Sequence, residues 1–578
     1  MNGPSRARRG AGATLLAFVA LHGGCSSVGI LDNDTPRWSP APDATSRIDP
    51  VDLLARSGTE LETPEDAMED MLDRALPLEE PDAVQSLQLE TVRRSVLENN
   101  LDLRTELVAP DIAAANLAAE EAKFESTFFA GYTRNDQGVL TDLEQGEPTN
   151  TDEFLAGLRV PLATGGDVTV DTLATRSDLG QTLLGSNEPW ESNVRFSISQ
   201  PLLRGAGLRT NTASIRIAGW NRDIASARLK LATIRAIADA DRAYWNLYAA
   251  WRELAVRRQQ YELAIAQMER AERRVQAGDA PEVEVIRARS GAGSTLEAII
   301  RADADLRIQQ RVVKRIMNDV RFPVSGDTAL EPATDPNPLR IELDGDELAR
   351  EAVASRMEML ELEIQLAIDS LEIDVRRNDA LPVFAVDYRY SIQGDDSGFG
   401  SAYSALGDSD SHRIGINGEI PLGNRARESR ITAAVLDRVA RLATRDARAQ
   451  SIRTEVYDAL DRLRQAWQSI LAARLETILA ARVVEGEQRQ FDVGLRTSTE
   501  VLDAQSRLAD AQSREIRALA AYQIALVDIA FATGTLLGQS RIDFIDVDGR
   551  TEIRTRSPDS VSGFQTRPTG DAAVDADR

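Results

Sequence analysis

Residues 491–508 read FDVGLRTSTEVLDAQSRL and interrupt a long run of helix-forming residues. The turn VGLRT contains Gly494, and glycine is typical of a helix that ends in a left-handed conformation. A new helix is predicted to begin at Thr499, and the carboxylates Glu500 and Asp503 follow. A catalytic acid pair, a helix N-terminus and a channel constriction would all place acidic residues in this way. The rest of the sequence is needed to distinguish these three interpretations.

The residues before this turn predict one very long helix, from about Arg425 to Val493. At 1.5 Å per residue it measures roughly 100 Å, which no compact domain houses. Asp446 and Arg453 interrupt its seam, either as partners of each other, as register-setting positions or as a partly solvated section. The seam has the spacing of four and three that makes helices supercoil around partners, and it comprises Val435, Val439, Leu442, Asp446, Ala449, Arg453, Val456, Leu460, Leu463, Trp467 and Ile470.

The chain repeats this pattern. A first long helix is predicted from about Asn211 to Ala277, with the same seam at Ile237, Ala240, Tyr244, Leu247, Trp251 and Leu254. Landmarks that recur in order indicate an internal duplication, and they pair Tyr132 with Tyr388, ISQPLLRGAG (198–207) with GEIPLGNRAR (418–427), Trp251 with Trp467, and Gly278 with Gly494. The predicted repeats are residues 85–321 and 346–545, with a Pro-rich linker at 322–345. Both tryptophans are interpreted as core residues rather than a ligand site.

Short alternating stretches predict β-strands with one apolar and one polar face, suited to a soluble sheet or to a barrel in lipid. Examples are residues 126–135, 194–199, 382–391 and 413–420. The first repeat carries about 36 residues more than the second between its matching strands. There LRVPL and DVTVDT flank ATGG (163–166), which predicts an additional hairpin near 153–175. Its place in the fold stays open.

Composition excludes several classes of function. The formal net charge of −25 disfavours nucleic-acid binding, because there is no excess of cations to displace counterions. The only histidines are His22 and His412 and the only cysteine is Cys25, which argues against zinc sites, disulfides and Ser-His-Asp or Cys-His triads. No metal and no organic cofactor are expected. A carboxylate glycosidase is disfavoured because no compact aromatic-lined domain accompanies Glu500 and Asp503.

The N-terminus resembles an export signal over residues 1–25. Arginines precede the apolar run 12–21, and LHGGC then resembles a lipoprotein cleavage site at which Cys25 becomes lipidated. Ordinary signal cleavage nearby is the alternative. Residues 26–84 are rich in Pro, Asp and Ser and are expected to form a flexible tether, with a short acidic helix near 64–76. The tail 546–578 is expected to be disordered, and no apolar stretch of 18 or more residues occurs after the signal.

These features together resemble the TolC family of outer-membrane efflux proteins over roughly residues 85–545. The most typical segments are QPLLRGAG (200–207), IPLGNRAR (420–427), FDVGLRTSTEVLDAQSRLADAQ (491–512) and AAYQIALVDIAFATGTL (520–536). The resemblance implies a homotrimer in which each chain gives four strands to a shared barrel and long helices to a periplasmic tunnel. The fold class is therefore mainly α with β: two repeats of long coiled-coil helices plus strands that contribute to a trimeric outer-membrane barrel. The additional hairpin departs from this pattern and puts a count of twelve strands in doubt.

The resemblance also implies roles for the opening stretch. It places Val493, Gly494 and Leu495 at the periplasmic tip, in a groove where an adaptor protein docks, with Gly278 as the only match in the first repeat. It places Glu500 and Asp503 on a pore constriction, as charged rings made by three copies. The alternative is that both acids favour the helix N-terminus and face solvent. Glu282 and Glu284 lie in the matching region of the first repeat, near Arg287 and Arg289.

The predicted function is a passive exit channel of a tripartite efflux pump or type I secretion system, without enzymatic activity. The expected partners are two further copies, a periplasmic adaptor, an inner-membrane transporter and outer-membrane lipid, and no nucleic acid. The alternative is a periplasmic coiled-coil lipoprotein that serves as a scaffold and does not conduct. The transported cargo is left open by the sequence.

Overall fold

The computed structural model describes residues 83–137, 149–178, 190–540, 542–544 and 564–566. All of them belong to one compact unit, residues 72–578. The predicted signal with Cys25, the acidic helix and nearly all of the tether lie outside the described residues, as does most of the C-terminal tail.

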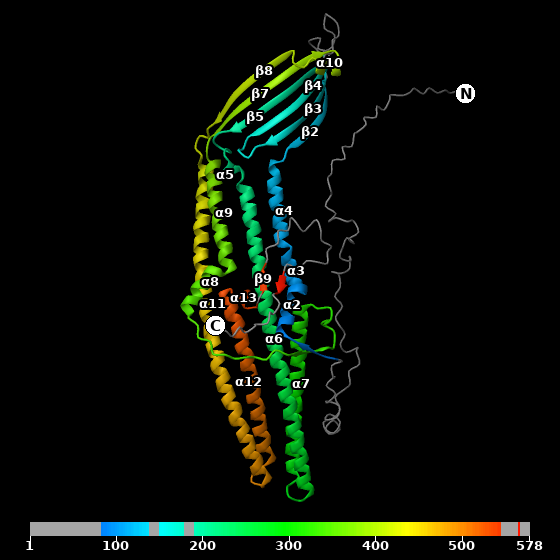
Figure 1. Cartoon of the computed structure of the whole chain (residues 1–578), viewed down its shortest axis with the longest axis vertical. Helices are drawn as coiled ribbons and strands as arrows, with labels where there is room; N and C mark the ends of the chain where they lie inside the picture. Colours follow the sequence, from blue (N-terminus) through cyan, green and yellow to red (C-terminus); the bar gives the residue numbers. More distant parts are fainter. Residues whose placement is uncertain (1–82, 138–148, 179–189, 541, 545–563, 567–578) are drawn as a thin grey trace, which may run out of the picture. The chain divides into compact units, whose positions relative to one another are not determined.

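Four long helices dominate the structure (Figure 1). They are α6 (Ala213–Gln276), α7 (Val283–Met317), α11 (Arg425–Asp492) and α12 (Ser498–Thr533). α6 packs on α7, α11 packs on α12, and α12 also packs on α6. The predicted lengths of the two long helices are confirmed, because α6 has 64 residues and α11 has 68, roughly 100 Å each.

The predicted seams differ in how much of each is buried. In α6 the residues Ile237, Ala240, Tyr244 and Leu247 are fully buried, and Trp251 packs against the same core. In α11 the lower seam from Ala449 to Ile470 is largely buried, whereas Val435, Val439 and Leu442 are exposed in the single chain. Asp446 and Arg453 are not partners of each other. Asp446 lies 3.7 Å from Arg445, and Arg453 donates a hydrogen bond to Gln450.

Shorter helices pack beside α6 and α11 (Figure 1). α2 (Leu89–Asn99), α3 (Leu101–Leu107) and α4 (Ala109–Glu121) precede the first strands, and α8 (Gly345–Ser355) and α9 (Met357–Asp379) precede the later ones. Apolar cores gather where α2 and α7 pack on α6, and where α8 and α12 pack on α11. The remaining short helices are η1 (Ala122–Phe124), α5 (Leu208–Asn211), α10 (Phe399–Ser404) and α13 (Leu536–Gln539).

Two small sheets involve segments that were expected to be irregular. β1 (Val84–Leu87) pairs in parallel with β6 (Ala329–Pro332), so the Pro-rich linker contains a strand because its backbone finds a partner beside α2. β9 (Ile542–Phe544) pairs antiparallel with β10 (Phe564–Thr566). The expectation of a wholly disordered tail is therefore wrong for residues 564–566.

The main sheet lies at one end of the long helices (Figure 1). Its strands are β2 (Thr127–Gln137), β3 (Thr149–Pro161), β4 (Asp167–Asp178), β5 (Trp190–Pro201), β7 (Val383–Asp396) and β8 (Ser409–Glu419). They are antiparallel neighbours in the order β2-β3-β4-β5-β7-β8. The additional hairpin is confirmed as β3–β4. The expectation of four strands in each chain is wrong, because this hairpin joins the same sheet and raises the number to six.

One helix of the described residues, α12, is long and apolar enough to cross a membrane by length and composition alone, where none was expected. Its most apolar window is 44% buried, and the helix packs on α6 and α11. These contacts are those of a core helix, since a lipid-facing helix would expose its apolar residues.

Candidate functional site

Both hairpin turns at the ends of the long helices have the same backbone structure. Gly494 has φ +78° and Gly278 has φ +81°, in the left-handed region that favours glycine. Leu495 donates its N–H to the carbonyl of Gln490 at 2.9 Å, and Asp279 donates to Arg274 at 2.8 Å. These bonds satisfy the last carbonyls of α11 and α6, and the interpretation of Gly494 as a helix cap is confirmed.

The two turns present different surfaces. Val493 and Leu495, on either side of Gly494, are 70% and 75% exposed. The first turn places Ala277 and Asp279 around Gly278, so it lacks large apolar side chains. The second turn therefore offers an apolar surface at its apex, whereas the exposed apolar residues nearest the first turn, Val283 and Ile286, lie on α7.

Glu500 is part of a helix N-terminus. With Thr497 it forms a capping box, in which Thr497 donates its backbone N–H to the Glu500 carboxylate at 2.8 Å. Arg496 donates a second bond to Glu500 at 2.7 Å. The Thr497 N–H and then the Arg496 guanidinium hold the pKa of Glu500 below its usual value. Glu500 is therefore an ionised cap whose charge is partly neutralised by Arg496.

Asp503 has fewer contacts than Glu500. Its side chain is 58% exposed and lies 2.8 Å from Arg507, one helical turn further along α12. In a single chain this carboxylate is the more accessible of the two. The role of both acids at a pore constriction stays a prediction.

Charged side chains connect the two hairpin tips. The backbone N–H of Ser498, at the start of α12, donates to the carboxylate of Glu284 on α7 at 3.0 Å. Glu284 is 8% exposed and also accepts a bond from Arg287 at 2.8 Å. On the other side, the guanidinium of Arg274 lies 4.9 Å from the centre of the Phe491 ring.

These contacts join the ends of α6 and α11 and the starts of α7 and α12. The sequence singled out Glu284 by its position but not its partner, because Ser498 lies 214 residues away. The Arg274–Phe491 contact was not predicted. An arginine one turn before Gly278, opposite an aromatic residue before Gly494, was the only signal for it.

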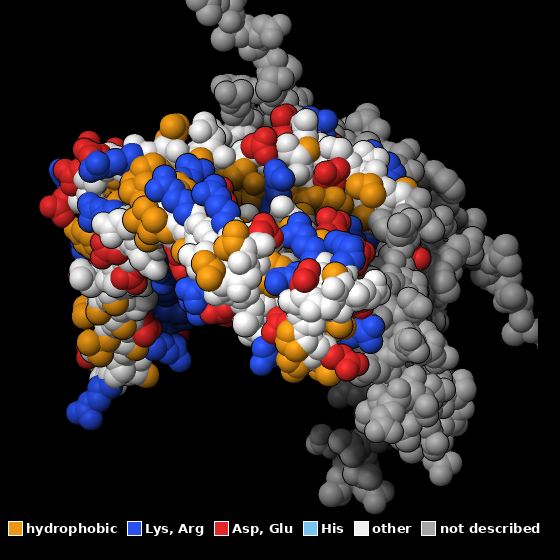
Figure 2. Space-filling view, turned by 90° about the horizontal axis from the view of Figure 1, so that it is seen from below, with side chains coloured by type: hydrophobic (Ala, Val, Ile, Leu, Met, Phe, Trp, Pro, Cys, Tyr) orange, Lys and Arg blue, Asp and Glu red, His pale blue; other side chains and the backbone are white. Residues whose placement is uncertain are grey.

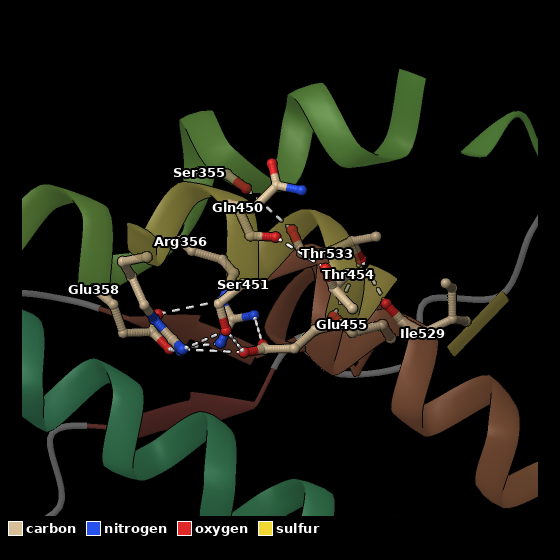
Figure 3. A network of polar contacts seen from close by, with 11 residues as sticks. Ser355, Arg356, Glu358, Gln450, Ser451, Thr454, Glu455, Ile529 and Thr533 are labelled. Carbon is tan, nitrogen blue, oxygen red and sulfur yellow. Dashed lines mark hydrogen bonds and ion pairs between the residues drawn. The ribbon is translucent and has the colours of Figure 1, made fainter. Parts of the chain in front are cut away.

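A buried ionic network lies further up the helices, where α8 meets α9 (Figure 3). Arg356 has an extended backbone between the two helices, and its side chain is 4% exposed. It binds Glu358 at 2.6 Å and also contacts Glu455 on α11. Arg448 completes the network with a bond of 3.0 Å to each of these carboxylates. The guanidinium of Arg356 therefore fixes the junction of α8 and α9 against α11.

Burial by itself raises the pKa of Glu358, but the hydrogen bonds from Arg356 and Arg448 outweigh it and hold the pKa below its ordinary value. The pKa of Glu455 is lowered for the same reason. Both carboxylates are therefore charged at neutral pH. The sequence did not predict this network, whose members are up to 99 residues apart.

Seen from below, acidic and basic side chains are intermingled over the described part of this face (Figure 2). Within residues 83–137, 149–178, 190–540, 542–544 and 564–566, no group of three or more His, Cys, Asp or Glu side chains is placed to hold a metal ion.

The described residues combine long paired helices with an amphipathic antiparallel sheet at one end. The structure is similar to the outer-membrane channel CmeC of Campylobacter jejuni, with a TM-score of 0.59 and 15% identity over 83% of this chain and 94% of that one. It is also similar to the open state of the Neisseria gonorrhoeae MtrE outer-membrane channel, with a TM-score of 0.57 and 16% identity over 78% and 89%.

The sequence comparisons agree with the fold. Residues 348–535 match the family described as Outer membrane efflux protein. The outer membrane protein TolC of Vibrio cholerae is 25% identical over 209 residues, which is 36% of this chain. That match spans 46% of the relative's length. The family match thus falls within the second predicted repeat, and the described residues have the fold of solved outer-membrane channels.

Proposed function

We propose that this protein is the outer-membrane exit channel of a tripartite efflux pump or type I secretion system, through which solutes pass without catalysis. The observation that carries the proposal is the six-stranded sheet. Its strands have 11 to 14 residues, enough for tilted strands to cross a bilayer. One face is largely apolar, and its exposed members are Phe128, Tyr132, Phe154, Leu158, Val170, Phe196, Phe384, Ile414 and Ile416.

The other features of the sheet support a membrane position. The charged residues on the apolar face, such as Arg134, Asp152 and Asp410, lie at the strand ends away from the long helices. The opposite face is largely polar and internally bonded: Asp171 pairs with Arg195 at 2.8 Å, and Ser199 donates to Asp387 at 2.6 Å. An apolar outer face and a polar inner face are what a water-filled barrel in lipid requires.

The edges of the sheet support the homotrimer that we propose. β2 and β8 are the first and last strands, and each has a neighbour on one side only. Unpaired backbone groups are not tolerated in lipid, so further copies have to close the sheet. The exposed seam residues Val435, Val439 and Leu442 support the same assembly, since a neighbouring helix would cover them.

The tip residues have proposed roles in this assembly. Val493, Gly494 and Leu495 form the docking surface for a periplasmic adaptor, and Gly278 shapes the neighbouring turn. Glu500 and Asp503 form the constriction, with Asp503 as the more exposed charge. An inner-membrane transporter supplies the energy, and Cys25 anchors the N-terminus through lipid.

The test is to isolate the protein from outer-membrane fractions and record its conductance in planar bilayers. A heat-modifiable trimer that conducts ions is the expected result. A soluble monomer or dimer without conductance would instead support a non-conducting coiled-coil scaffold.

A further inference from the structure

The hairpin β3–β4 is a complete part of the membrane sheet. β3 pairs with β2 from Arg159 opposite Thr127 to Thr149 opposite Gln137. β4 pairs with β5 from Asp167 opposite Ser199 to Arg176 opposite Trp190. Every pair is antiparallel, so inserting two strands leaves the directions of the edge strands β2 and β8 unchanged. The hairpin therefore lengthens the sheet without altering how its edges can pair.

The hairpin has the same two faces as the strands around it. Phe154, Leu158 and Val170 lie on the apolar face, in register with Phe128 and Phe196. On the polar face, Asp171 of β4 is nearly buried and binds Arg195 of β5.

The polar face of the hairpin is also fitted closely to β2. Gly157 faces Phe129, whose ring would come within 2.6 Å of a Cβ atom at position 157. Both faces of the hairpin therefore match those of β2 and β5, the two strands between which it lies.

The turn of the hairpin fits the joint between the sheet and the helices. Gly165 has φ +93°, and a Cβ atom there would lie 2.0 Å from the carbonyl of Gly205. The carbonyl of Thr164 accepts the N–H of Gly207 at 3.0 Å. The hydroxyl of Thr164 donates to the side-chain carbonyl of Gln200 at 2.7 Å. The turn is thus held by QPLLRGAG (200–207), the segment that connects β5 to α5.

The six strands match the width of the helices beneath them. α4 packs on α6, α6 on α9 and α9 on α11, so four helices of one chain lie in a row. Helices spaced 8–10 Å apart give such a row a width of about 32–40 Å. Six strands spaced about 4.8 Å apart and tilted about 40° cover about 38 Å, whereas four cover only about 25 Å.

We propose that the β3–β4 hairpin widens the membrane barrel to eighteen strands, so that the barrel is as wide as the helical tunnel. This inference rests on the proposed trimeric channel. Three copies give a backbone diameter of about 36 Å, against about 24 Å for twelve strands. Subtracting side chains of about 5 Å on each wall leaves an open width of roughly 26 Å in the eighteen-stranded barrel and roughly 14 Å in the twelve-stranded one. A pair of helices is about 20 Å across and passes only the wider barrel, whereas a single helix of about 10–12 Å passes both, so the cargo class includes polypeptides that carry a helical hairpin.

Electron cryomicroscopy of the full-length trimer and of a variant lacking residues 149–189 tests the barrel width. In the variant, residues 138–148 still connect β2 to β5. The expected result is a barrel of about 36 Å in the full chain and about 24 Å in the variant, with the same helical tunnel. A full-length trimer whose barrel measures about 24 Å, with the hairpin outside it, would overturn the inference.

Cysteine labelling in intact cells gives a second test that requires no deletion. With Cys25 unchanged, because lipidation consumes its thiol, Glu153→Cys and Arg159→Cys on the polar face should react with a charged, water-soluble maleimide, and the unsubstituted chain gives the background labelling. Their neighbours Phe154→Cys and Leu158→Cys should react at least tenfold more slowly. Equal labelling of all four would mean that the hairpin lies in water, and the inference would be wrong.

The same labelling on β8 separates this inference from the proposed function. Arg413→Cys and Ile414→Cys lie on opposite faces of a strand that does not belong to the hairpin. If these two differ while the four hairpin positions do not, the channel stands and the wide barrel fails. If the β8 positions also label equally, the proposed membrane barrel itself is refuted.

Discussion

Replacing Glu284 with Gln should loosen the contact between the two hairpin tips. The carboxylate accepts the Ser498 N–H at 3.0 Å, and its side chain is only 10% exposed. A hydrogen bond to a charged group contributes about 1.5–3 kcal/mol and a neutral one about 0.5–1.5, so the change costs about 1 kcal/mol in each chain. If the tips of all three copies separate together, the closed state of the trimer loses about 3 kcal/mol of stabilisation. At 1.4 kcal/mol per tenfold change, the open fraction should rise roughly 150-fold.

Single-channel recordings in planar bilayers measure this open fraction directly. Glu282→Gln is the matched control, since Glu282 is exposed, lies two residues before Glu284 and carries the same charge. Its open probability should equal that of the wild type. Equal open probabilities for Glu284→Gln and Glu282→Gln would refute the role of the Glu284–Ser498 bond in holding the tips closed.

Four further predictions concern the other groups. Arg356→Met should lower the free energy of unfolding by about 3 kcal/mol, because it leaves buried carboxylates unpaired. Thermal unfolding followed by circular dichroism measures this loss. Arg350→Met, at an exposed position, is the control. The pKa of Glu358 in the folded protein lies below its ordinary value of 4.5. The stability that Glu358 contributes is therefore present at neutral pH and should be lost as the pH falls below 4.5. An acid-unfolding midpoint that Arg356→Met leaves unchanged would contradict this. Gly494→Val should strain the left-handed turn by about 1–2 kcal/mol or more and reduce adaptor cross-linking, whereas Gly486→Ala inside α11, where a Cβ meets open space, should not. Glu500→Gln with Asp503→Asn should raise conductance and weaken block by divalent cations while keeping the helix cap, and unchanged conductance would remove both residues from the constriction.

Several features of the fold were predictable because they depend on local residue patterns. The heptad spacing and the glycines that end each run set the bounds of α6 and α11 to within about two residues. The alternation of polar and apolar residues located β2, β5, β7 and β8, and ATGG located the turn between β3 and β4. The exposed Val493 and Leu495 follow from the tight turn in which they lie.

Contacts between distant segments could not be predicted in the same way. Nothing in the spacing of Arg356 indicates Glu455, and the Glu284 carboxylate is caught by a backbone N–H that every non-proline residue carries. The acid at Glu500 was open to two interpretations, since a capping box and a charged constriction use the same residue type. The capping box is observed in the single chain, and the constriction depends on copies that meet around an axis.

By itself, the sequence determined the elements: two helices of about 100 Å, their glycine turns, and strands with one apolar face, because each depends on residues within a few positions of one another. Only the tertiary structure decided that β3 and β4 lie between β2 and β5, and that the buried Arg356 joins α8 and α9 to α11. The reason is physical. A strand's alternation specifies which face is buried but not its neighbour, and a buried charge is stabilised by whichever opposite charge the fold brings within hydrogen-bond distance.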